Sequence, residues 1–84
     1  MSYSIKIKAS AAKALKRLAK VDRLRIVDAI DRLQTEPHAG GVLKGEFSGL
    51  RRLRVGRYRV VYEVDGHQFS ILVVRIGHRK EIYR

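Results

Sequence analysis

Three predicted strands follow one another in the second half of this 84-residue chain, and they constrain its fold more than any other feature. They cover residues 51–55, 57–64 and 68–76, where β-branched and aromatic residues are frequent. Gly56 separates the first two strands, and Asp65-Gly66 predicts a tight turn of the primed type before the third. Because such short connections leave no room for a crossover, these strands are expected to pair antiparallel.

The first half of the chain is predicted to supply one more strand and two helices. Residues 4–9 alternate apolar and polar side chains, which is typical of a half-buried strand with Ile5 and Ile7 facing inward. Ser10 then resembles a helix N-cap, followed by a helix over 11–20. The apolar side chains on one face of that helix are Ala11, Ala14, Leu15 and Leu18.

A second helix is predicted from Asp22, as its N-cap, to about Gln34, with Pro37 just beyond its end. Its apolar residues recur at intervals of three and would share one face. They are Leu24, Val27, Ile30 and Leu33. The glycine-rich stretch that follows, over 38–48, predicts a loop with Leu43 and Phe47 as its apolar anchors.

The order β-α-α-β-β-β predicts a single α+β domain over 1–84, since no repeat or linker interrupts it. We expect two layers, a mainly antiparallel four-stranded sheet with two helices packed on one face. Two helices cannot cover both faces of such a sheet. The other face is therefore expected to be at least partly open.

Strand alternation predicts which side chains share each face of the sheet. Those expected to face the helices are Leu53, Tyr58, Val60, Tyr62, Leu72, Val74 and Ile76. Those expected on the open face are Arg52, Arg54, Arg59, Val61, Glu63, Val73 and Arg75. Four arginines would then share the open face. A one-residue bulge at Gly56 would reverse part of this assignment.

The charge of the chain indicates an anionic partner. Nineteen Lys and Arg against eight Asp and Glu give a formal net charge of +11, and eight of the twelve arginines fall within 51–84. Nucleic acid, an acidic protein and an acidic membrane surface each carry the negative charge that would complement this positive charge. A membrane fits least, because neither predicted helix joins an aromatic-rich apolar face to a basic one. With no bilayer-spanning or signal-like apolar stretch, a soluble cytoplasmic protein is expected.

Metal, thiol and cofactor chemistry find little support in the sequence. The chain has no cysteine, and His38, His67 and His78 lack the spacing of metal ligands. No glycine-rich nucleotide loop, paired acidic metal cage or nucleophile elbow is present. We therefore expect no structural metal and no cofactor.

The strongest candidate site is formed by Arg52, Arg54 and Arg59, which strand pairing would bring within reach of one phosphate. The alternative is a solvated strand face, although cations crowded on one face repel each other. RNA cleavage by its own 2′-hydroxyl needs a base, cations for the phosphorane charge and an acid for the 5′-oxygen. Possible bases are Glu46, Glu63 and Glu81, and the sequence assigns none of them.

Several segments together resemble the RelE branch of the RelE/ParE toxin superfamily. They are Leu43-Lys44-Gly45, the stretch 49–64 with the run LRVGRYRVVYEV, and the ending GHRKEIYR at 77–84. The helix over 11–18 and Pro37 also match, so the resemblance covers nearly the whole domain. It implies an antitoxin-regulated toxin that enters the ribosomal A site and inhibits translation. There the toxin would cleave mRNA without metal, as an endoribonuclease that leaves a 2′,3′-cyclic phosphate.

The resemblance also implies roles for single residues. By position, Arg52, Arg54 and Arg59 would hold and stabilise the scissile phosphate. Arg79 matches the residue assigned to leaving-group protonation, and Tyr83 matches the tyrosine that stacks on or activates the nucleotide. The remaining expected site residues are His78, which stands where members carry lysine or histidine, and the RNA-binding residues Lys44, Arg51, Arg57, Arg75 and Lys80.

Two other functions stay open. A ParE-like protein would share the fold and poison DNA gyrase by contact, and a non-catalytic basic module would bind ribosomal RNA with a steep salt dependence. The partners implied by the leading hypothesis are the ribosome, mRNA and a small acidic or helical antitoxin. Contact with DNA is expected only through the antitoxin complex.

Overall fold

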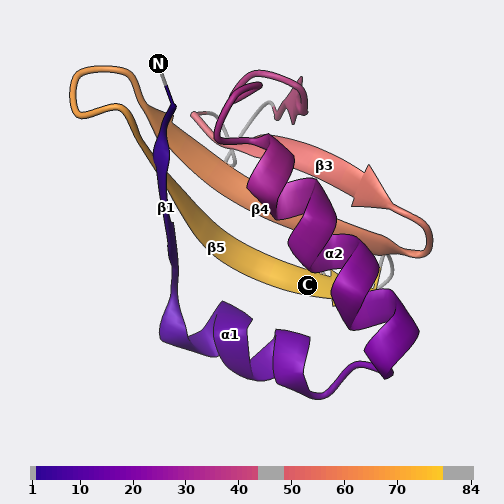
Figure 1. Cartoon of the computed structure of the whole chain (residues 1–84). Coiled ribbons are helices and arrows are strands. Elements are labelled where there is room, and N and C mark those ends of the chain that lie inside the picture. The colour runs from indigo at the N-terminus through magenta and orange to yellow at the C-terminus, as the bar shows by residue number, and fades with distance from the viewer. Residues whose placement is uncertain (1, 44–48, 79–84) are drawn as a thin grey trace.

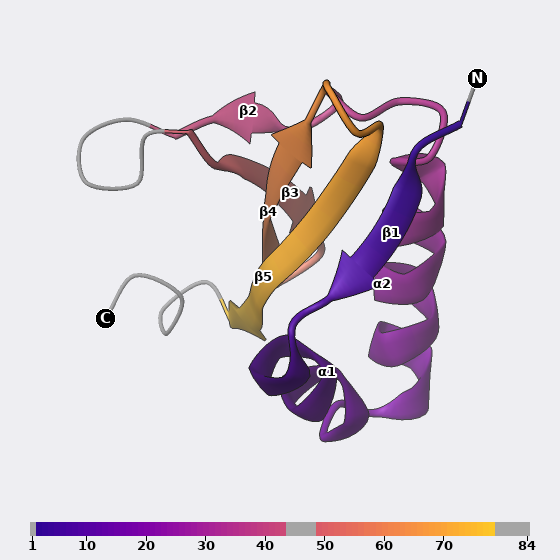
Figure 2. The same cartoon turned by 90° about the vertical axis from the view of Figure 1, so that its left-hand side faces the viewer.

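A computed structural model describes residues 2–43 and 49–78 of the chain. It contains two helices, α1 (Ala9–Lys16) and α2 (Lys20–Arg32). The strands are β1 (Ser4–Ile7), β2 (Gly41–Val42), β3 (Arg51–Val55), β4 (Tyr58–Asp65) and β5 (Ser70–His78). The helix α2 lies along one face of the sheet, and α1 lies on the same side near the end of β5 (Figures 1 and 2). The predicted two-layer α+β architecture is confirmed.

The sheet has five strands in the order β1-β5-β4-β3-β2. Strand β1 pairs with β5 in parallel, and the other neighbours are antiparallel. The extra strand, β2, lies in the segment predicted as a loop and pairs only two residues with β3. A strand this short carries no alternation that a sequence pattern could reveal.

The core lies between the sheet and the helices, and seven of the ten buried residues that form it in the described part of the chain were predicted to face inward, whereas Ile7, also predicted inward, is exposed. The core consists of Ala11, Leu15, Ile26, Ile30, Leu33, Val60, Tyr62, Ile71, Val73 and Ile76. The predicted face of α2 was partly wrong, because Ile26 is 0% exposed whereas Leu24 is 55% exposed. An interval of three residues falls about 60° short of a full helical turn, so a stripe with that spacing drifts around the helix. The buried residues of α2, Ile26 and Ile30, and its buried C-cap, Leu33, instead follow the i, i+4, i+7 spacing.

Both predicted N-caps were wrong. The N-cap residues are Lys8 and Ala19, and neither makes a capping hydrogen bond through its side chain. Lys8 still donates its backbone N–H to the carbonyl of Val73 at 2.9 Å, so the end of the β1–β5 pairing determines where α1 begins. Ser10 and Asp22 consequently lie inside the first turns of their helices.

A β-bulge in β5 changes the predicted faces of that strand. Val61 pairs with Arg75 and Tyr62 pairs with Val73, so Val74 has no residue opposite it on β4. The prediction was therefore wrong for Leu72, which is 38% exposed on the open face, and for Val73, which is 0% exposed under the helices. Beyond the bulge, Arg75 pairs with Val61 and lies on the open face, as predicted.

The two hairpin turns differ from each other. Gly56 has a φ of +59° in a two-residue turn closed by the pair Val55 and Tyr58, as the position of the glycine predicted. The predicted primed turn at Asp65-Gly66 was wrong, since four residues, 66–69, separate β4 from β5. The Asp65 carboxylate instead accepts hydrogen bonds from the backbone N–H groups of His67 (2.9 Å) and Gln68 (3.2 Å).

Within the described ranges, neither helix is long and apolar enough to cross a membrane.

Candidate nucleic-acid interface

Four arginines lie on the sheet face opposite the helices, and we call this set the arginine face: Arg52, Arg54, Arg59 and Arg75. Strand register places them in two adjacent rows. In the first row Arg54 pairs with Arg59, and in the second Arg52 and Arg75 both pair with Val61. Residues that pair directly across antiparallel strands point to the same side of the sheet. The prediction that these four arginines share one face is thus confirmed.

The arginine face concentrates positive charge around a largely buried centre. Arg59 is only 9% exposed and Val61 is buried, whereas Arg52, Arg54 and Arg75 are exposed. A buried guanidinium loses most of its freedom to rearrange, so the donors of Arg59 occupy a defined position within the sheet. Permanent cations on three adjacent strands make this face suited to a phosphodiester.

Arg51, predicted to bind RNA, lies on the other side of the sheet. It pairs with the core residue Tyr62, and its Nη1 donates hydrogen bonds to the carbonyls of Gly40 (2.7 Å) and His38 (3.4 Å). Its guanidinium therefore holds the segment before β2 against β3. Arg57, by contrast, is exposed in the turn next to the pair Arg54 and Arg59.

The structure does not bring His78 to the arginine face. His78 pairs with Tyr58, and the two rings meet edge to face with centroids 6.0 Å apart. Tyr58 packs against the core and donates its hydroxyl to the Asp22 carboxylate of α2 at 3.4 Å. A pocket of about 320 Å³ on this side of the sheet is lined by Ala14, Arg17, Leu18, Tyr58, Ile76, Gly77 and His78. His78 therefore lies on the helix side of the sheet.

The other predicted site residues, Lys44, Arg79, Lys80 and Tyr83, lie outside the described residues, as do the candidate bases Glu46 and Glu81. Glu63 is described. It is exposed and pairs with Leu72, in the row next to Val61 on the open face. Among residues 2–43 and 49–78, no group of three or more His, Asp or Glu side chains could hold a metal ion.

A buried tyrosine that the sequence did not single out for a role holds the segment that leads into the edge strand β2. The Tyr62 hydroxyl accepts a hydrogen bond from the backbone N–H of Gly40 (2.9 Å) and donates one to the carbonyl of Pro37 (3.0 Å). Burial raises the pKa of Tyr62 above its usual 10.0, although the Gly40 hydrogen bond and the charge of Arg51 oppose this rise. The hydroxyl therefore stays protonated and anchors the segment that leads into β2.

Gly40 is the second residue whose importance the sequence did not reveal. A Cβ at this position would lie 2.6 Å from the carbonyl oxygen of Arg52 and 2.8 Å from the Tyr62 hydroxyl. Only glycine lets the chain pass this close to β3. No local pattern signals the requirement, because both contacts come from residues distant in the sequence.

Comparison with known proteins supports the resemblance drawn from the sequence. A family model described as the ParE toxin of type II toxin-antitoxin system, parDE, matches residues 5–83. Toxin RelG of Mycobacterium tuberculosis is 30% identical, over 100% of this chain and 99% of its own length. Toxin RelE of the same organism is 33% identical, over 98% of this chain and 87% of its own.

Solved structures agree with the fold. The toxin–antitoxin complex RelBE2 of M. tuberculosis contains a chain that matches with a TM-score of 0.87 and 26% identity, covering 94% of this chain and 100% of its own. A chain of the archaeal RelE–RelB complex from Pyrococcus horikoshii OT3 matches with a TM-score of 0.79 and 33% identity, covering 96% of this chain and 99% of its own. The chain therefore belongs to the RelE/ParE superfamily of toxins from type II toxin–antitoxin systems, within its RelE branch.

Proposed function

We propose that this toxin is a ribosome-dependent endoribonuclease that cleaves mRNA in the ribosomal A site without metal. The observation that carries the proposal is the arginine face, where register brings four guanidinium groups into two adjacent rows on one side of the sheet. Guanidinium donors match the oxygens of a phosphodiester, and they stabilise the extra negative charge that develops when its phosphorus is attacked.

In the proposed reaction, the 2′-oxygen of the RNA attacks the adjacent phosphorus. A bond forms between the phosphorus and the 2′-oxygen, and the bond to the 5′-oxygen breaks. The 2′-hydroxyl loses its proton to a base and the 5′-oxygen gains one from an acid, so the products are a 2′,3′-cyclic phosphate and a 5′-hydroxyl. Arg52, Arg54 and Arg59 hold the phosphate and stabilise the phosphorane.

The base that accepts the 2′-proton cannot be one of these arginines, because a guanidinium that stays protonated throughout the physiological range has no free electron pair to accept a proton. Following the family pattern, we assign leaving-group protonation to Arg79 and stacking on the nucleotide to Tyr83. His78 receives no role at the phosphate, since its partner in the register is Tyr58 on the helix side. Arg57, Arg75, Lys44 and Lys80 would bind neighbouring parts of the RNA, whereas Arg51 is engaged with backbone carbonyls.

An antitoxin is part of the proposal. The RelBE2 and P. horikoshii structures are toxin–antitoxin complexes. A net charge of +11 favours an acidic partner, and a small antitoxin whose acidic or helical segment covers the arginine face would exclude RNA from it. DNA would be contacted only through that complex.

The test uses purified toxin, ribosomes and an mRNA with one defined codon in the A site. We expect a new mRNA end within that codon, and we expect Arg59→Ala to slow cleavage about 100-fold or more. Arg25→Ala is the matched control, because Arg25 is an exposed arginine of α2 and its loss should leave the rate unchanged. Intact mRNA despite normal ribosome binding by the wild-type toxin would refute the proposal.

The description of the matching family as ParE toxins supports one competing function, poisoning of DNA gyrase by contact. A supercoiling assay separates the two. Inhibition of gyrase that persists in Arg59→Ala would favour the contact mechanism, because that mechanism does not use the phosphate-binding arginines.

A further inference from the structure

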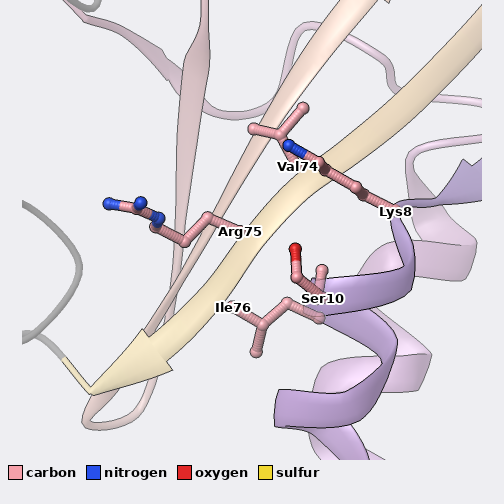
Figure 3. Close-up of a pocket in the computed structure, with 6 residues that line it drawn as sticks. Lys8, Ser10, Val74, Arg75 and Ile76 are labelled. Atoms are coloured by element: carbon pink, nitrogen blue, oxygen red, sulfur yellow. The ribbon is translucent and has the colours of Figure 1, made fainter.

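A pocket of about 250 Å³ opens at the edge of β5, where β1 ends and α1 begins. It is lined by Lys8, Ser10, Ala11, Val74, Arg75 and Ile76 (Figure 3). The last β1–β5 pair is Ile7 with Val73, and the chain then turns into α1. The pocket therefore lies at the point where the sheet loses its outermost strand.

The polar groups of this pocket favour an anion. Figure 3 shows the Lys8 side chain extended across β5 toward Val74, the Ser10 hydroxyl pointing toward the strand, and the Arg75 guanidinium projecting outward from the strand. None of the six lining residues is acidic. A phosphate oxygen could accept hydrogen bonds from the ammonium group and the hydroxyl there, while the Arg75 guanidinium points away from them on the other side of β5.

The pocket is continuous with the arginine face through Arg75. Arg75 lines the pocket and also pairs with Val61, which pairs with Arg52 on the next strand. Two strand spacings separate Arg52 from Arg75, a distance of about 10 Å. Arg75 pairs with Val61 immediately beyond the bulge at Val74, and this pairing keeps Arg75 on the open face of the sheet.

We propose that Lys8 and Ser10 form a second phosphate site, which binds a phosphate next to the scissile one on the same RNA strand. The inference rests on the proposed function, since the arginine face supplies the first phosphate site. An RNA strand crossing the sheet from Arg52 to Arg75 reaches the pocket as it passes the edge of β5. When the RNA is held at two of its phosphates, its position on the toxin is fixed, and this determines which linkage lies against Arg59. Lys8 is therefore a positioning residue.

The first experiment measures how binding of a single-stranded oligoribonucleotide depends on salt. The oligonucleotide carries a 2′-deoxy substitution at the mapped cleavage position, so it cannot be cut. Losing one phosphate contact lowers the slope of log K against log salt by about 0.7 for a single strand. We expect this change for Lys8→Ala and retention of the wild-type slope for Lys8→Arg.

Lys6→Ala is the matched control, because it removes the same charge two residues away. Lys6 lies on β1 opposite Leu72 and lines a different pocket, together with Glu63 and Asp65. Its removal should leave the slope unchanged. The side chains of Lys6 and Lys8 are exposed, and the hydrogen bonds of Lys8 with Val73 and Ala12 use its backbone groups, so Lys6→Ala and Lys8→Ala should both keep the wild-type melting temperature.

The second experiment locates the phosphate. Methylphosphonate is placed at one linkage at a time in the same oligonucleotide, which neutralises that phosphate. Wild-type toxin should lose affinity at the scissile linkage and at one neighbouring linkage. Lys8→Ala should become insensitive at the neighbouring linkage only, because the two changes remove the same contact.

The outcomes separate this inference from the proposed function. If the wild-type toxin cleaves A-site mRNA but Lys8→Ala matches Lys6→Ala in both binding experiments, the second phosphate site is wrong. If the toxin never cleaves mRNA but Lys8→Ala still loses one phosphate contact, the nuclease assignment is wrong and the phosphate site stands.

Discussion

Arg54 of β3 and Arg59 of β4 lie directly opposite each other, next to the turn that joins their strands. Their Cβ atoms are therefore about 5 Å apart, and two like charges in this arrangement destabilise the sheet. Arg59 is also buried, which reduces the screening of its charge by water. A folded chain that retains such a pair gives up stability, and a bound phosphate would relieve the repulsion.

This pairing predicts opposite effects on stability and on activity. Replacing Arg54 by threonine, a good strand former, should raise the free energy of unfolding by about 0.2–1 kcal/mol and slow mRNA cleavage. Arg52→Thr is the control. Arg52 pairs with Val61, so this variant should slow cleavage without the same gain in stability. Urea denaturation and the ribosome assay give the two readouts, and equal stability of the two variants would contradict the repulsion argument.

Gly40 should tolerate no side chain. Gly40→Ala would push a methyl group against the Arg52 carbonyl and the Tyr62 hydroxyl, and overpacking of this kind costs about 1–3 kcal/mol. A methyl group on the adjacent Gly41 would meet no atom within 4 Å, so Gly41→Ala should change stability far less. Denaturation midpoints of the two variants test this difference, and equal losses would show that the close approach at Gly40 carries no energetic weight.

The buried hydroxyl of Tyr62 should make stability depend on alkaline pH. Its pKa is raised in the folded state, so the unfolded chain releases this proton first as the pH rises. The stabilisation is fully present below about pH 10 and is lost as the pH rises from there through the folded pKa. Tyr62→Phe should be less stable at neutral pH, by about 0.5–1.5 kcal/mol for each lost hydrogen bond. The difference between wild type and variant should shrink above pH 10, and a constant difference would contradict the predicted pKa direction.

The bulge in β5 predicts unequal costs for two neighbouring residues. Val73→Ala removes buried methyl groups and should lower the free energy of unfolding by about 1–3 kcal/mol. Leu72→Ala removes a larger side chain from the exposed face, and its effect should stay within about 0.5 kcal/mol. Thermal or urea unfolding of the two variants decides the register. A larger loss for Leu72→Ala would mean that the bulge is misplaced.

Much of the fold was predictable from local patterns. Alternation in β3 and β4 placed Arg52, Arg54 and Arg59 on one face correctly, because side chains along a regular strand point to opposite sides in turn. The buried residues Ala11 and Leu15 of helix α1 were predicted correctly, although the helix spans Ala9–Lys16 and ends four residues before the predicted end at Lys20. These features depend on residues close together in the chain, so the sequence carries their signal directly.

By itself the sequence determined the α+β class, the strongly basic surface, the four arginines of the arginine face and the resemblance to RelE toxins. Tertiary structure alone decided the features that depend on contacts between distant segments. The bulge at Val74 exchanged the faces of Leu72 and Val73, pairing with Tyr58 took His78 to the helix side, and the Tyr62 hydroxyl made Gly40 indispensable. Each depends on register and close packing between strands, which no periodicity within a single segment encodes.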